Sequence, residues 1–182
     1  MDPETALERV SYFQGQILGA DDFTVEQDYF LAKHRRHNRY LHGWGVVSGL
    51  QVTTTAASEV VVEPGVAIDC AGNEIHLCAQ VRLQLPSQPP VLFLALSYSE
   101  TRTTPVPVPA AADPATTPAD GQAFSRIREG FLLELVALNP TAGHRGQKTG
   151  TPGCGCPHPL CIARLTHGRS GWKVKLRGRR RA

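Results

Sequence analysis

The residues best suited to chemistry form one short segment, CGCPHPLC. Cys154, Cys156 and Cys161 supply three thiols and His158 supplies an imidazole within eight residues. Thiolate and imidazole ligands suit Zn²⁺, and the neighbouring Gly and Pro residues permit a tight turn. The sequence therefore predicts a candidate structural zinc site made of these four residues, with zinc as the cofactor to consider.

Other interpretations of these cysteines stay open. The Cys-x-Cys spacing strains a shared metal, because zinc ligands are usually separated by two to four residues. Cys161 falls in an apparent strand, so ordinary loop and core cysteines are one alternative, and a disulfide or redox pair is another. His144 or His167 could replace an unsuitable ligand. Cys70 and Cys78 flank a turn, and we interpret both as packing residues.

The rest of the chain offers no pattern that predicts catalysis. His34 and His37 lie three residues apart, with Glu26 and Asp28 before them, but the HExxH order of zinc hydrolases is missing. Hydrogen-bonded histidines on a helix are the simpler interpretation. The glycines on either side of Trp44 follow a helix and lack the Lys-Ser/Thr of a phosphate loop. We therefore expect a protein that is not an enzyme.

The composition is that of a globular chain. It has 182 residues, of which 41% are hydrophobic and 19% charged, and its 17 Gly and 14 Pro indicate many turns. No apolar run approaches the ~18 residues that span a bilayer, and the N-terminus is acidic and polar, unlike a secretory signal. We expect synthesis in the cytoplasm without a signal peptide and without a membrane span.

Positive charge is concentrated at the C-terminus. The last ten residues contain six of the 19 Lys and Arg residues and no acid, so the rest of the chain is net acidic. This tail lacks an aromatic stacking platform, which favours an assembly contact or a solvated end over nucleic-acid binding. Its basic residues are Lys173, Lys175, Arg177, Arg179, Arg180 and Arg181.

One helix is predicted from about Phe23 to Leu41, a stretch without Gly or Pro. Thr24, Asp21 or Asp22 is expected to cap its start, and Gly43 with its neighbours is expected to end it. One face mixes apolar residues with polar ones, which is unusual for an internal helix and predicts a surface where copies or partners meet. The predicted docking residues are Tyr12, Phe13, Phe23, Phe30, His34, Asn38, Leu41 and Trp44.

After the helix the hydrophobic period changes to two, which predicts seven or eight strands. The expected strands cover 46–54, 60–62 with 66–68, 75–85, 91–96, 124–138, and 160–166 with 172–176. The segment 91–96, VLFLAL, is apolar throughout and is expected to be a central strand. A Pro-rich stretch, about 101–123, is predicted to be an extended surface loop.

These elements predict a mainly β fold with an N-terminal helix (α+β) and an antiparallel β-sandwich or barrel-like body. Residues 1–45 are expected to form an arm and docking helix. Residues 46–177 are expected to form the β-rich domain, which includes the Pro-rich loop and a Cys-rich loop at about 150–161. The basic tail follows at 178–182.

Several long motifs carry a family resemblance. They are YFQGQILGADDFTVEQDYFLAKHRRHNRYLHGWGVVSGLQV, VVVEPGVAIDCAGNEIHL, LSYSETRTTPVPVP and FSRIREGFLLEL. Together they resemble accessory baseplate or fibre-associated proteins of contractile phage tails and phage-tail-like injection systems. The resemblance implies a non-enzymatic structural or adaptor protein within such a particle, which binds other particle proteins and forms a homo-oligomer, with a trimer favoured. It supplies no catalytic residues. The alternative is a zinc-stabilised module that binds protein or nucleic acid.

Overall fold

The computed structural model describes residues 6–107, 122–144 and 153–178. In these ranges it contains one helix, α1 (Ala20–His37), which continues into a π-helical turn, η1 (Asn38–His42). The strands are β1 (Gly45–Gly49), β2 (Val52–Thr54), β3 (Glu59–Val62), β4 (Gly65–Ile68), β5 (Glu74–Leu77), β6 (Val81–Gln84), β7 (Val91–Pro107), β8 (Gln122–Val136), β9 (Leu160–Gly168) and β10 (Gly171–Leu176). The predicted fold class, mainly β with an N-terminal helix, is confirmed.

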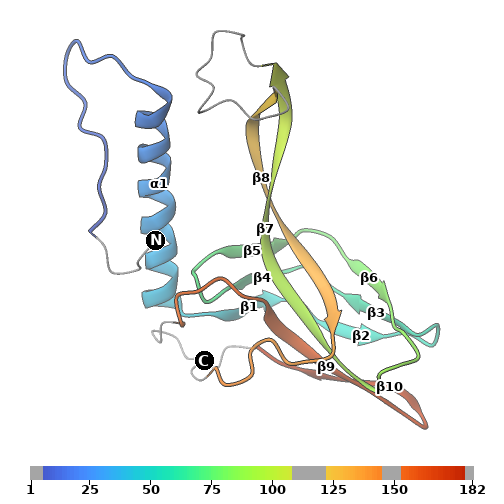
Figure 1. Ribbon diagram of the computed structural model, residues 1–182. Coiled ribbons are helices and arrows are strands. Elements are labelled where there is room, and N and C mark those ends of the chain that lie inside the picture. The colour runs from blue at the N-terminus through green and yellow to red at the C-terminus, as the bar shows by residue number, and fades with distance from the viewer. Residues whose placement is uncertain (1–5, 108–121, 145–152, 179–182) are drawn as a thin grey trace.

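The described strands form antiparallel sheets that curl into a half-barrel (Figure 1). Two small sheets have the orders β1-β4-β5 and β2-β3-β6, and the larger sheet has the order β10-β9-β7-β8. The chain passes from one small sheet to the other after β1, after β3 and after β5. The two small sheets are therefore the two halves of three long strands that all bend at the same level.

This bend explains why the described residues contain ten strands and not the seven or eight predicted. The expected strand 46–54 is divided into β1 and β2 at Gly49 and Leu50, whose φ angles of 61° and 49° are incompatible with a continuous strand. The expected strand 75–85 is likewise divided into β5 and β6. A pattern of period two does not reveal such a bend, because alternation resumes after it.

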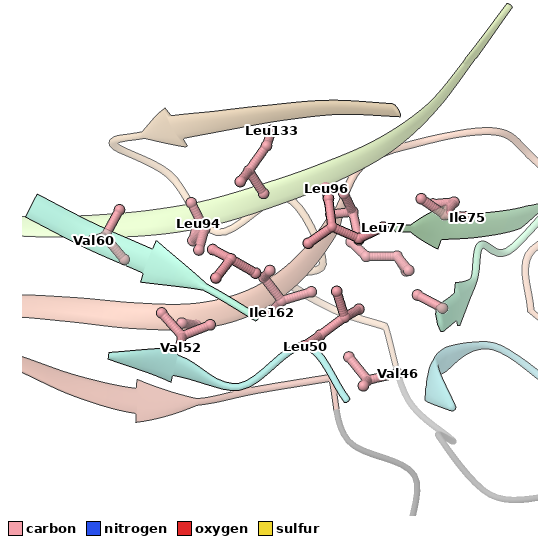
Figure 2. Close-up of a cluster of buried hydrophobic side chains, with 14 of the residues drawn as sticks. Val46, Leu50, Val52, Val60, Ile75, Leu77, Leu94, Leu96, Leu133 and Ile162 are labelled. Carbon is pink, nitrogen blue, oxygen red and sulfur yellow. The ribbon is translucent and has the colours of Figure 1, made fainter. Parts of the chain in front are cut away.

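The hydrophobic core lies where the large sheet covers the two small ones. Leu94 and Leu96 of β7 are fully buried, and Figure 2 shows them close to Leu77 of β5 and Ile162 of β9. Strand β7 lies between β9 and β8, so the apolar segment 91–96 is a central strand, as predicted. Burial of these side chains supplies the main driving force for folding of the body.

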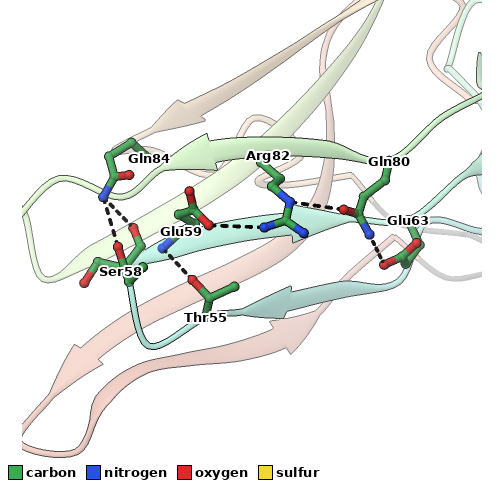
Figure 3. Close-up of polar contacts among 8 residues, drawn as sticks. Thr55, Ser58, Glu59, Glu63, Gln80, Arg82 and Gln84 are labelled. Carbon is green, nitrogen blue, oxygen red and sulfur yellow. Dashed lines mark hydrogen bonds and ion pairs between the residues drawn. The ribbon is translucent and has the colours of Figure 1, made fainter.

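The opposite face of the β2-β3-β6 sheet is polar (Figure 3). Arg82 of β6 lies 3.5 Å from the carboxylate of Glu59 on β3, and its Nε donates a 3.1 Å hydrogen bond to Gln80. The amide of Gln80 in turn donates a 2.7 Å hydrogen bond to Glu63. Exposed pairs of this kind add little stability, so this face contributes solubility more than cohesion.

The Pro-rich stretch is partly a strand, which corrects the prediction of a loop across about 101–123. Strand β7 continues to Pro107 and β8 begins at Gln122, with Pro105 opposite Phe124. Strand β9 pairs only with residues 91–96 of β7, so within the described residues the far part of β7 pairs with β8 alone. An edge without a second partner tolerates proline, which cannot donate a ladder hydrogen bond. Residues 108–121 of the expected loop lie outside the described residues.

Helix α1 begins three residues earlier than predicted. Gly19 precedes its first turn, and the side chain of Asp22 accepts a 2.8 Å hydrogen bond from the Gly19 amide. Thr24 does not cap the helix, because its hydroxyl donates to the carbonyl of Ala20 inside the helix. At the other end the π-helical turn stops before Gly43, whose positive φ of 69° ends the helical segment as expected. Among the described residues, no helix is long and apolar enough to cross a membrane.

Candidate metal centre and the foot of helix α1

Four side chains that suit a metal ion converge at the end of the body nearest α1. One potential ligand atom from each of Cys70, His144, Cys154 and His158 lies within 4.8 Å of the others. The Sγ of Cys70 is 3.6 Å from Nδ1 of His144. The rings of His144 and His158 pack edge to face, with 4.3 Å between their centroids. In the described part of the chain, no second group of three or more such side chains comes this close.

His158 is held in the orientation of a metal ligand. Its Nδ1 lies 3.0 Å from the carbonyl oxygen of Pro159, and donation of Nδ1–H to that oxygen leaves a lone pair on Nε2. Nε2 itself is buried and has no hydrogen-bond partner. Imidazole ligands of metals commonly have this second hydrogen bond to a carbonyl oxygen, which sets the tautomer and the ring orientation.

Cys70 belongs to the tight turn between β4 and β5. Asp69 organises this turn, because its carboxylate accepts 2.8 Å and 2.7 Å hydrogen bonds from the backbone and side-chain amides of Asn73. Burial of the Cys70 thiol raises its pKa to about 12. Without a metal the thiol therefore stays protonated at neutral pH, and a bound cation would take the place of that proton.

His144 comes from the loop after β8. Asn139 shapes this loop by accepting hydrogen bonds from the backbone amide and the hydroxyl of Thr141, both 3.1 Å long. The ring of His144 packs edge to face against buried Trp44, with 5.7 Å between the ring centroids. Burial and the charge of nearby His158 lower the pKa of His144, which favours the neutral imidazole that binds metals.

The same turn that carries Cys70 also supports the last part of α1. The side-chain amide of Asn38 is buried and donates a 3.0 Å hydrogen bond to the carbonyl oxygen of Gly72. A Cβ on Gly72 would collide with the backbone carbonyl of Arg35, so the turn and the helix touch through their main chains. Nearby, the guanidinium of Arg35 forms an ion pair with the carboxylate of Glu100 on β7, with 3.6 Å between the nitrogen and oxygen atoms. These contacts form the foot of α1, which we define as residues 35–38.

The structure brings together two of the four predicted metal ligands. Cys154 and His158 are in the cluster, whereas Cys156 is exposed in the loop and Cys161 is buried in β9 with its thiol directed to the carbonyl of Ala163. His144 was considered as a substitute ligand and does join the cluster. Cys70 was interpreted as a packing residue and is also in the cluster. It lies 84 positions before Cys154, so no local spacing links the two.

The predicted docking residues divide into an exposed group and a buried pair. Asn38 is buried at the foot of α1, and Trp44 is only 2% exposed in the core. His34 faces solvent on α1 and lies beside a groove that also includes His37 and Glu74. The remaining residues are exposed, namely Tyr12, Phe13, Phe23, Phe30 and Leu41.

The described part of the basic tail lies on β10 and just after it. Lys173 and Lys175 of β10 and Arg177 are exposed. Their side chains follow the outer face of a strand whose other residues, including Trp172 and Val174, pack against the core. Arg179, Arg180 and Arg181 lie outside the described residues.

Comparison with known proteins gives its result at the level of fold. A chain of the TssK–TssF–TssG baseplate subcomplex of the type VI secretion system superimposes with a TM-score of 0.53 at 13% sequence identity. A chain of the type VI secretion baseplate complex does so with a TM-score of 0.50 at 14% identity. The chain shares its fold with type VI secretion baseplate proteins. No family model and no curated protein sequence matches it.

The likeness extends over nearly all of this chain. It covers 93% and 94% of the chain in the two comparisons. The chain spans only 60% and 58% of the baseplate chains that it matches. At this level of sequence identity the shared feature is the fold, and the roles of individual residues do not transfer.

Proposed function

We propose that this protein is a non-enzymatic structural or adaptor component of the baseplate of a contractile, phage-tail-like injection system. The fold likeness to type VI secretion baseplate proteins, over more than nine-tenths of the chain, is the observation that supports this role most directly. The motif resemblance to accessory proteins of contractile tails supports the same role independently. Incorporation into such a particle, among other particle proteins, follows from the proposal.

We further propose that residues 1–45 assemble the protein and that residues 46–177 form its body. Helix α1 has no buried side chain in its 18 residues. Most helical stability in proteins comes from packing of one face, so a helix without buried side chains is expected to have a packing partner. The exposed aromatic residues Phe23 and Phe30 lie two turns apart on α1, which fits a packing face left open in the single chain.

A cleft beside α1 supports the same interpretation. It has a volume of about 800 Å³ and lies between the N-terminal arm, α1 and residues 98–100 of β7. Leu7, Val25 and Tyr29 line its apolar part, and Arg36 and Glu100 line its polar part. A second copy of the chain, or a neighbouring particle protein, is the expected occupant. A trimer is the favoured homo-oligomer.

Replacement of Phe23 and Phe30 by Glu together tests the assembly role. We expect wild-type protein to show a multiple of the 19.7 kDa chain mass in size-exclusion chromatography with light scattering, and the double variant to be monomeric. Charged side chains on a packing face cost more than the contact contributes, because they lose hydration when buried. A control variant, Ile127→Glu, changes a side chain that is 65% exposed on β8 and should leave the mass unchanged.

The particle role has its own test. We expect the wild-type chain to co-purify with contractile particles and the Phe23/Phe30 variant to be depleted from them. A wild-type protein that is strictly monomeric and also absent from purified particles would exclude the proposal.

A zinc-stabilised module that binds protein or nucleic acid is the second candidate. The observation in its favour is the cluster of two thiols and two imidazoles, with the basic strand β10 on the same body. Nucleic-acid binding predicts affinity for a labelled oligonucleotide that falls steeply between about 50 and 200 mM salt, because released counterions drive such binding. Equal affinity for Lys173→Ala and wild type would contradict this candidate.

A further inference from the structure

We propose that Cys70, His144, Cys154 and His158 bind one Zn²⁺ ion, and that this ion fixes the foot of α1 to the β-body. The four side chains come from three segments that are distant in sequence: the β4–β5 turn, the loop after β8, and the loop before β9. This site differs from the one predicted by local spacing, because only Cys154 and His158 are common to both.

The ligand set identifies the metal. Two thiols and two imidazoles form a soft, closed set of four, which is the donor set of structural zinc sites with tetrahedral geometry. Zinc–sulfur bonds of about 2.3 Å and zinc–nitrogen bonds of about 2.0 Å place tetrahedral ligand atoms roughly 3.3 to 3.8 Å apart. The observed separations, all within 4.8 Å, need to contract by about 1.5 Å at most. Cys154 and His158 lie in a loop before β9, where such an adjustment is easy.

The buried Nε2 of His158 is the second observation that points to a ligand. A buried polar atom without a partner loses its hydration and gains nothing in return, so such atoms are rare in native proteins. Here the Nδ1 hydrogen bond to Pro159 leaves Nε2 with a lone pair, and the cluster lies beside it. A zinc ion satisfies this atom and the Sγ of Cys70 at the same time.

The position of the site links it to the helix. Gly72, two residues after Cys70, touches the backbone of Arg35 and accepts the hydrogen bond of Asn38. On the other side, a Cβ on Gly155, next to Cys154, would stand 2.9 Å from the guanidinium of Arg39. Two proposed ligands, Cys70 and Cys154, therefore lie one or two residues from a glycine that contacts α1 or η1.

The ion would thus hold the helix indirectly, through the turn and the loop that contact the foot of α1 and η1. Gly153 packs so closely on Cys70 that a Cβ would lie 2.8 Å from the Cys70 Cα. With zinc bound, the turn and the two loops are joined by four bonds, and the foot of α1 keeps one orientation relative to the body. Without zinc, only the hydrogen bonds and packing contacts of this region hold it. The proposal is independent of the adaptor role, since it concerns metal content and local order alone.

Metal analysis of the full-length protein, purified without chelator, is the first test. We expect about one zinc per chain in wild type and less than ~0.2 in the Cys154→Ser and His158→Asn variants, since structural zinc is bound tightly enough to survive purification. Cys156→Ser is the matched control, because Cys156 lies in the same loop outside the cluster and should keep about one zinc per chain. Cobalt substitution should give the visible absorption of a tetrahedral site with thiolate ligands in wild type and in the control variant.

Hydrogen exchange of wild-type protein, with and without chelator, is the second test and needs no variant to fold. We expect metal removal to speed amide exchange on the order of tenfold at residues 35–43 and 69–73, while exchange in β7 and β9 is unchanged. Three results would overturn the proposal. They are less than ~0.2 zinc per chain even after zinc is added to reduced protein, a Cys70–Cys154 disulfide in freshly purified protein, and equal zinc loss in Cys156→Ser and Cys154→Ser.

Discussion

At the scale of single residues, the five cysteines have different environments in one chain. Cys70 and Cys161 are buried, whereas Cys78, Cys154 and Cys156 are exposed, and all five are free thiols. Cys70 and Cys154 meet two histidines, while Cys161 lies in the core of β9. Their roles therefore follow from tertiary position and not from their proximity in sequence.

Alkylation should separate the core cysteine from the exposed ones. Burial raises the pKa of Cys161 from its ordinary value of 9.0 to about 11. The thiolate is the reactive form, so at pH 8 we expect iodoacetamide to modify Cys78 and Cys156 and to leave Cys161 unmodified in the native protein. Mass spectrometry of peptides measures this, and modification of Cys161 as fast as Cys156 would contradict it.

The same shift predicts a loss of stability at high pH. The folded state keeps the Cys161 proton up to a higher pH than the unfolded state does. The contribution of the protonated thiol to the free energy of unfolding is therefore complete below pH 9.0 and is lost as the pH rises through about 11. Denaturant unfolding of wild type and Cys161→Ala between pH 8 and pH 11 measures the difference. The variant should show a smaller decline than wild type, and equal slopes would contradict the prediction.

At the scale of elements, α1 depends on contacts at one end. Its foot rests on the β4–β5 turn through Asn38 and the backbone of Arg35, and its other turns project beside the β7–β8 ribbon (Figure 1). The change from α to π geometry at Asn38 occurs at the residue whose side chain enters the body. The attachment of the helix to the body therefore depends on a few contacts at its foot.

Gly72→Ala should disturb this attachment. Gly72 has a φ of 91°, and an added Cβ would collide with the Arg35 carbonyl, so we expect both backbone strain and displacement of the helix. The control Gly171→Ala has a similar φ of 90° but open space around it, and should cost only the strain of about 1 to 2 kcal/mol. Chemical denaturation should show a larger loss for Gly72→Ala. Equal losses of unfolding free energy in the two variants would mean that the contact between Gly72 and Arg35 does not contribute to stability.

At the scale of the whole molecule, one core joins all the sheets. Strand β7 provides the centre, since Leu94 and Leu96 contact strands on both sides and the bent small sheets below (Figure 2). The body should therefore unfold as a single cooperative unit, whereas α1, without buried side chains, contributes less to global stability.

Leu96→Ala tests the role of this centre. Leu96 is fully buried, and its truncation should lower the free energy of unfolding by about 2 to 5 kcal/mol, because it leaves a cavity in the core. Leu132→Ala, on the neighbouring β8 and 49% exposed, is the matched control and should change stability by about 0.5 kcal/mol or less. Similar losses in urea unfolding would show that the core is not centred on β7.

The sequence by itself determined the helix, most of the strands, the mainly β class and the central position of 91–96. These features follow from local periodicity and from Gly and Pro signals, which act between near neighbours in the chain. It also indicated Cys154 and His158, two residues of the observed cluster, because three thiols and an imidazole lie within eight residues there.

Only the tertiary structure decided the rest. The bends at Gly49–Leu50 and after β5, and the burial of Trp44 and Asn38, depend on the fit of one sheet against another. Cys70 and His144 join the cluster because the sheet topology brings the β4–β5 turn to the loops on either side of residues 145–152. Contacts between segments so distant in sequence leave no local pattern, because they are created when the half-barrel closes on its core.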